Sequence, residues 1–184
     1  MTDPGAALTT PDFVVLGMIS RGASSGYEIK KWVATSIRFF WTISEAQIYP
    51  SLERLERAAL VASRPAPNGR RRRRAFELTP AGRRVLHDWL VRAEPMPFEL
   101  RDVALVRLFF ADSLSRPEAR ALLDAVRRRS EARIAALQAI EPTAGPAQTD
   151  GDHPRLTLRM GVAFHQVMIG VCDAFEREAD PSAG

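Results

Sequence analysis

Five consecutive arginines, Arg70–Arg74, are the strongest chemical feature of this chain of 184 residues. They follow a Pro67-Asn68-Gly69 turn and precede the short β-like run Ala75–Leu78. Guanidinium groups at the tip of a turn suit phosphate, because they carry a permanent charge and several donors. The plain alternative is a solvated basic loop. A neighbouring element that reads base edges would favour nucleic-acid binding, because phosphate contacts alone carry no sequence information.

Charge is spread unevenly along the chain. Residues 1–92 hold 15 Lys and Arg against 8 Asp and Glu, a net of +7, whereas residues 93–184 hold 11 against 14, a net of −3. A basic first half and an acidic second half indicate two different tasks, the first of them facing nucleic acid.

Catalytic and metal-binding arrangements are missing from the sequence. His87, His153 and His165 are too far apart to predict a metal set, and Cys172 is the single cysteine, which excludes an internal disulfide. No Ser/His/Asp, Cys/His or glycine-rich phosphate-binding motif is present. We therefore expect a protein that is not an enzyme and needs no cofactor. The N-terminus shows no signal peptide and no stretch has the roughly 18 apolar residues of a membrane span, so a cytoplasmic protein is expected.

The best-defined element is a helix that starts after Ser44. Ser44 and Gln47 fit a capping box, and Ile48, Leu52 and Leu55 then form one apolar stripe. Pro50 lacks an amide hydrogen, so we expect it to kink the helix. The opposite face is polar, as in a helix that lies in the major groove of DNA.

The surrounding elements predict a winged helix-turn-helix. An apolar segment at 13–19 is a helix or a strand, and Ser25 caps a further helix. Residues 60–64 and 73–78 predict two strands, and Thr79 with Pro80 starts a fourth helix. The predicted groove contacts are Thr42, Ser44, Gln47, Tyr49 and Arg54; the predicted phosphate contacts are Ser25, Tyr27, Lys31, Arg70, Arg71, Arg72 and Arg73. Packing rings remain the alternative for both tyrosines.

The second half of the sequence predicts long helices with apolar seams. One follows the start signal Ser115–Glu118, another runs from Leu156 to about Glu178, and residues 142–154 between them form a linker. Each seam can face a second chain or pack within its own chain. The seam residues are Leu123, Val126, Ile134, Leu137, Met160, Phe164, Val167, Met168, Val171 and Phe175.

Several segments together resemble the PadR family of bacterial transcriptional regulators. They are Gly26–Ile29, Trp41–Ser44, Ile48–Glu56 with its internal Tyr-Pro pair, and Arg74–Gly82; a weaker likeness continues at Leu105–Asp112. The sequence departs from that pattern at Phe76, where the family usually has Tyr. It also lacks the tryptophan that often lies near the end of the last helix, where this chain reads Ile-Gly-Val-Cys.

The resemblance implies a mainly helical protein with a small β-hairpin. We expect a flexible arm at 1–11, the winged helix-turn-helix at 12–93 and a helical dimerisation domain at 94–180. It further implies a cytoplasmic homodimer that binds a palindromic double-stranded DNA operator and represses transcription until a small molecule or another signal relieves it.

Two expectations remain beside this reading. Aromatic residues near the junction of the two domains could line a pocket for a small hydrophobic or aromatic effector, or could simply be core; they are Trp89, Phe98, Phe109, Phe110 and Phe164. The alternative function is a helical adaptor that binds protein through its C-terminal seam and has lost DNA binding. RNA binding is disfavoured because no aromatic stacking platform is visible.

Overall fold

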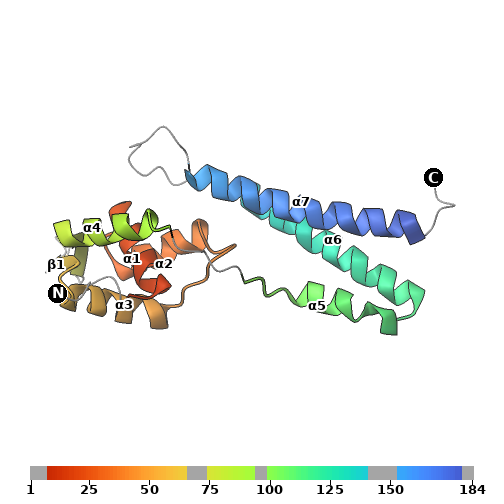
Figure 1. The fold of residues 1–184 in the computed structure, drawn as a ribbon, viewed down its shortest axis with the longest axis horizontal. Coiled ribbons are helices and arrows are strands. Elements are labelled where there is room, and N and C mark those ends of the chain that lie inside the picture. The colour runs from red at the N-terminus through yellow and green to blue at the C-terminus, as the bar shows by residue number, and fades with distance from the viewer. Residues whose placement is uncertain (1–7, 66–73, 94–98, 141–152, 180–184) are drawn as a thin grey trace. The chain divides into compact units, whose positions relative to one another are not determined.

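The computed structural model describes residues 8–65, 74–93, 99–140 and 153–179, which form two compact units (Figure 1). The chain is mainly helical, with one antiparallel hairpin, as the sequence predicted. Among the described residues, none of the helices combines the length and apolar character of a membrane span. The N-terminal unit holds α1 (Thr10–Ser20), α2 (Gly26–Thr35), α3 (Glu45–Arg57), β1 (Val61–Pro65), β2 (Arg74–Leu78) and α4 (Pro80–Leu90). The C-terminal unit holds α5 (Val103–Phe109), the 3-10 helix η1 (Ala111–Ser113), α6 (Arg116–Gln138) and α7 (His153–Ala179).

Side-chain caps start the helices of the N-terminal unit, where the sequence placed them. The Ser25 hydroxyl accepts from the Glu28 amide, and the Thr79 hydroxyl accepts from the Gly82 amide. At α3, the Gln47 side-chain oxygen accepts from the Ser44 amide at 3.0 Å, which closes the predicted capping box. The segment at 13–19 is helical, and α3 continues through Pro50 to Arg57.

One apolar core holds the N-terminal unit together. The stripe of α3, formed by Ile48, Leu52 and Leu55, is fully buried against α1 and the start of the hairpin. The hairpin pairs Val61 with Leu78, so both strands place an apolar residue in this core. Burial on this scale fixes which face of α3 looks outward, because only its other face is left for solvent.

Gly82 allows the fourth helix to approach the hairpin closely. A β-carbon added at Gly82 would lie 2.0 Å from the backbone oxygen of Leu60. Backbone cannot move away as a side chain can, so only glycine fits here.

The C-terminal unit is built on two long antiparallel helices, α6 and α7, which lie side by side (Figure 1). Leu123 and Val126 of α6 are buried with Cys172 of α7. Arg127 adds a polar link, since its guanidinium donates to Asp173 at 2.6 Å and to Glu176. Burial raises the pKa of the Cys172 thiol, which is therefore a packed apolar group rather than a reactive thiolate.

Candidate nucleic-acid interface

The start of α3 and the segment just before it present polar side chains to solvent. Thr42, Ser44, Gln47 and Tyr49 are all exposed, while Ile48 between them is completely buried. The Gln47 side-chain oxygen is engaged by Ser44, at both the backbone amide and the hydroxyl, which holds the amide group in place. No acceptor among the described residues binds its NH₂, a donor of the kind that reads an acceptor on a base edge.

A concave surface, which encloses a volume of about 390 Å³, lies where α2 begins, beside α3 and β2. It brings together three predicted contacts, Ser25, Tyr27 and Tyr49. Both tyrosines are largely exposed, with relative residue exposures of 69% for Tyr27 and 52% for Tyr49. The complete lining is Ser25, Gly26, Tyr27, Tyr49, Leu52, Glu53, Arg74 and Phe76.

Gly26 explains how the Tyr49 ring lies in this surface. A β-carbon at position 26 would come within 2.7 Å of Cε1 of Tyr49. The ring therefore rests directly on the backbone at the start of α2. The sequence does not reveal this contact, because no local pattern shows that a residue 23 positions after Gly26 packs against it.

The hairpin is tied to both helices of the interface. The Phe76 amide donates to the Ser24 carbonyl at 2.7 Å, which joins β2 to the loop before α2. Arg74 donates to Ser63 at 2.6 Å and pairs with Glu56 of α3, and its guanidinium lies 5.3 Å from the centre of the Phe76 ring. Hydrogen bonds from Ser63 and Arg74 hold the pKa of Glu56 below its ordinary value. Arg74 therefore braces the hairpin, a role that the arginine run by itself did not reveal.

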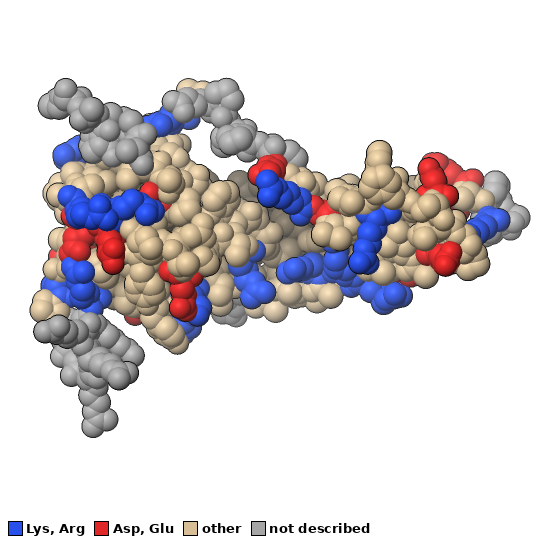
Figure 2. Space-filling view, turned by 90° about the horizontal axis from the view of Figure 1, so that it is seen from below, with Lys and Arg blue, Asp and Glu red and all other residues tan. Residues whose placement is uncertain are grey.

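The other predicted residues of the interface lie as follows. Lys31 is exposed on α2, and its neighbour Lys30 forms an ion pair with Glu45 of α3. Arg70–Arg73 lie outside the described residues. On the face that Figure 2 shows, basic and acidic side chains lie next to one another over the N-terminal unit. The described part of this unit thus carries positive and negative charges side by side.

Arg54, a predicted groove contact, has a partner within the chain. Its Nη2 donates to Oδ1 of the buried Asp12 at 2.7 Å and to the Ser51 hydroxyl at 3.0 Å. The guanidinium is thus bound to α1, while 41% of the side chain remains exposed. Sequence spacing placed Arg54 on the outer face, and it could not show that a carboxylate 42 residues earlier comes within reach.

The predicted dimer residues divide into two groups, which corrects part of the expectation. Leu123, Val126 and Leu137 are buried inside the C-terminal unit, Ile134 is half-buried, and Met168 packs against the same cluster. The seam of α6 is therefore covered by its own chain. The α7 residues of the second group are exposed, with fractions of 64%, 38%, 62%, 62% and 60%; they are Met160, Phe164, Val167, Val171 and Phe175.

The residues of the expected effector pocket lie in separate units. Trp89 belongs to the N-terminal core, where its ring stacks on Phe13 at 4.6 Å. Phe109 and Phe110 are exposed and touch each other edge to face, Phe164 is on α7, and Phe98 lies outside the described residues. That pocket stays a prediction.

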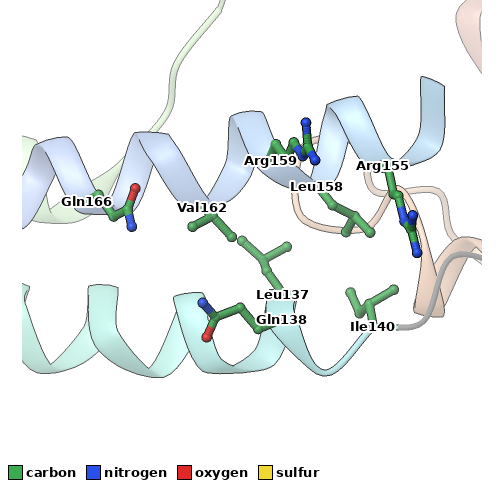
Figure 3. A pocket seen from close by; sticks show the side chains of 8 residues that line it. All are labelled: Leu137, Gln138, Ile140, Arg155, Leu158, Arg159, Val162 and Gln166. Atoms are coloured by element: carbon green, nitrogen blue, oxygen red, sulfur yellow. The ribbon is translucent and has the colours of Figure 1, made fainter. Parts of the chain in front are cut away.

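A separate groove lies within the C-terminal unit, between the end of α6 and the start of α7 (Figure 3). Its volume is about 610 Å³ and its aliphatic side chains point into the space between the two helices. The lining residues are Leu137, Gln138, Ile140, Arg155, Leu158, Arg159, Val162 and Gln166.

Comparison with known proteins accounts for both units. Residues 15–88 match the transcriptional regulator PadR-like family, and residues 100–178 match the C-terminal region of the virulence activator alpha family. The negative transcriptional regulator PadR of Bacillus subtilis (strain 168) is 31% identical over 127 residues, which cover 68% of this chain and 70% of the relative.

Two solved structures extend the likeness to the fold. Bacillus subtilis PadR in complex with operator DNA superposes with a TM-score of 0.80 at 26% identity, covering 91% of this chain and 97% of that one. Bacillus subtilis PadR in complex with p-coumaric acid gives a TM-score of 0.73 at 26% identity, covering 98% and 99%. The chain belongs to the PadR-like family: it is a DNA-binding transcriptional regulator and not an enzyme.

Proposed function

We propose that this protein is a homodimeric repressor that reads a palindromic operator with α3 and holds the DNA backbone with its hairpin. The observation that supports this most is the exposed polar side of α3, where Gln47 stands in the first turn and Tyr49 lies with Ser25 and Tyr27 on one concave surface. Base edges would meet Thr42, Ser44, Gln47 and Tyr49. Phosphates would meet Ser25, Tyr27, Lys31 and Arg70–Arg73. The relative from Bacillus subtilis is a negative regulator, which favours repression.

The salt dependence of DNA binding distinguishes residues that read bases from residues that bind phosphates. Replacing Arg70, Arg71 and Arg72 with Ala should weaken binding to all duplexes and lower the slope of log K against log salt by about 0.9 for each lost phosphate contact. Gln47→Ala should instead leave the slope unchanged and reduce discrimination at one base pair of each half-site, by about 1–3 kcal/mol. Unchanged salt dependence in the arginine variant would remove the hairpin tip from the interface.

The exposed side of α7 supports a homodimer. Its large apolar residues lie four, four, three, four and four positions apart, so they form one stripe along the helix; they are Leu156, Met160, Phe164, Val167, Val171 and Phe175. Cys172 is the single buried residue in this helix of 27 residues. A long apolar stripe that the described part of its own chain leaves exposed is typical of a subunit interface. A second copy would bury it and present two copies of α3 to two half-sites.

We propose that a small hydrophobic or aromatic molecule relieves repression. A solved Bacillus subtilis PadR contains p-coumaric acid, an aromatic acid, which supports this class of effector. The test is an electrophoretic shift with operator DNA in the presence of a panel of aromatic acids and neutral aromatics. Release of DNA at a fixed salt concentration by one of these compounds, with retention under the others, would identify the class. No release by any compound would contradict relief by this class.

The alternative of a helical adaptor without DNA binding predicts the opposite result in the same assay. Such a protein would shift neither the operator nor random duplex, while its α7 stripe still bound a partner. Gln47 exposed at the first turn of α3 and the capping box that fixes its oxygen favour the DNA-binding function.

A further inference from the structure

A buried carboxylate links the first helix to the recognition helix α3. Asp12 lies in the first turn of α1 and is completely buried. One of its oxygens accepts from the Thr9 amide at 2.9 Å and from the Thr9 hydroxyl at 2.8 Å. The other oxygen accepts from Arg54 at 2.7 Å. Burial alone would raise the pKa of Asp12, but the hydrogen bonds from Arg54, Thr9 and Ser51 lower it below its ordinary value, so the group is ionised at neutral pH.

The partner arginine lies on the helix that carries the base-reading residues. Arg54 is five positions after Tyr49 and seven after Gln47, and it also donates to the buried Ser51 hydroxyl. The apolar residues Ile48, Leu52 and Leu55 of α3 share one core with the apolar residues of α1. Aliphatic contacts tolerate small shifts of a helix, whereas a charged hydrogen bond to a fixed, buried oxygen does not.

We propose that Asp12 and Arg54 are positioning residues for operator recognition. Their ion pair sets the rotation and height of α3 on α1, and Arg54 contributes to operator affinity without touching DNA. Base reading requires side chains to be held within about 0.5 Å of the productive geometry. A loss of the pair would therefore misplace Gln47 and Tyr49 even though neither residue had been changed. The inference rests on the proposed recognition of an operator by α3.

The direction in which Asp12→Asn changes the affinity for DNA tests this proposal. Asp12→Asn keeps the size of the side chain and removes one negative charge from a protein that binds a polyanion. Simple electrostatics predicts tighter binding, because less repulsion remains. Positioning predicts weaker binding, by about tenfold, comparable to the loss of one base contact. Asp88→Asn, an exposed carboxylate on α4 of the same unit, is the matched control and should leave binding equal or slightly tighter.

Arg54→Met completes the test. Methionine keeps the apolar stem of the side chain but not the guanidinium. We expect operator affinity to fall about tenfold, with a salt slope equal to that of the wild type. The double variant Asp12→Asn with Arg54→Met should bind no more weakly than Arg54→Met alone, because both changes remove the same contact. Binding is measured by fluorescence anisotropy at a temperature where circular dichroism shows every variant folded.

Three results would overturn the proposal. They are an Asp12→Asn variant that binds as tightly as the wild type or more tightly, additive losses in the double variant, and a slope lowered by about 0.9 in Arg54→Met, which would mean a phosphate contact. Should either variant fail to fold, Asp12→Glu keeps the charge and displaces the carboxylate by one methylene; it should weaken binding at an unchanged slope, and wild-type affinity would overturn the proposal. A wild-type protein that binds no duplex selectively would instead refute the proposed operator recognition itself.

Discussion

At the scale of single residues, the orientation of Tyr49 depends on the absence of a side chain at position 26. We predict that Gly26→Ala weakens operator binding about tenfold while the melting temperature changes little. The added methyl group would meet the end of a side chain, at 2.7 Å from Cε1 of Tyr49, and the ring can swing away at small cost. The measurement is operator affinity together with a thermal melt.

Gly17→Ala is the matched control for this change. Gly17 also lies in a helix, and a β-carbon there would meet nothing within 4 Å. It should leave affinity unchanged and stabilise α1 by about 0.5–1 kcal/mol through helix propensity. Equal affinity of the Gly26→Ala variant and the wild type would show that the orientation of Tyr49 is unimportant for DNA binding.

Local residue roles could be predicted from the sequence, and distant partners could not. The caps at Ser25, Ser44 and Thr79 each depend on a residue three positions away, so their patterns are visible in the chain. The partner of Arg54 is 42 positions away. Such a contact depends on how α1 packs against α3, and no spacing rule reaches that far.

At the scale of elements, helix type was easier to predict than helix partner. The seam of α6 was recognised from its periodicity, but periodicity reports only that a face is covered and not which chain covers it. The structure shows that α7 of the same chain covers Leu123, Val126 and Leu137. The contact of Arg74 with Glu56 likewise depends on how the two strands pair, and the arginine run does not show that pairing.

The packing of α7 against its neighbours also predicts an effect of pH. Burial, Arg129 and Arg133 lower the pKa of His165, and Asp102 opposes them only in part. Its buried Nδ1 has no hydrogen-bond partner among the described residues, so no hydrogen bond stabilises a proton there. Below about pH 6.5, His165 therefore takes up a proton in the unfolded chain but stays neutral in the folded unit. The free energy of unfolding consequently decreases as the pH drops below about 6.5.

Calorimetry of the full chain at pH 7.5 and pH 5.5 measures this effect. The wild type should melt at a lower temperature at the acidic pH, and His165→Gln should lose part of that difference. His87→Gln, an exposed histidine on α4, is the control and should keep the full difference. An identical pH dependence in His165→Gln and the wild type would contradict the burial of a neutral imidazole.

At the scale of the whole molecule, the account depends on a second copy of the chain. We predict that the wild type sediments as a dimer of the 20.4 kDa chain, and that Val167→Asp with Val171→Asp sediments as a monomer. Two carboxylates in the middle of the α7 stripe would have to be buried without partners, which is strongly unfavourable. Operator affinity should fall as well, because two half-sites would no longer be bound by one linked pair.

Gln166→Asp provides the control for added charge. Gln166 is an exposed polar residue beside the stripe on the same helix, so this variant should remain dimeric. A wild type that is monomeric at micromolar concentration, or a doubly charged variant that stays dimeric, would exclude α7 as the dimer interface.

The central claim is that α3 reads a two-fold operator while the hairpin holds the DNA backbone, and selection of genomic fragments tests it most directly. Purified wild-type protein is incubated with sheared genomic duplex at about physiological salt, and the enriched fragments are footprinted. The account predicts a palindromic site whose half-sites are separated by one helical turn, about 10 base pairs, or a multiple of it. Enrichment no greater than that of random duplex, in the absence of any added small molecule, would contradict it.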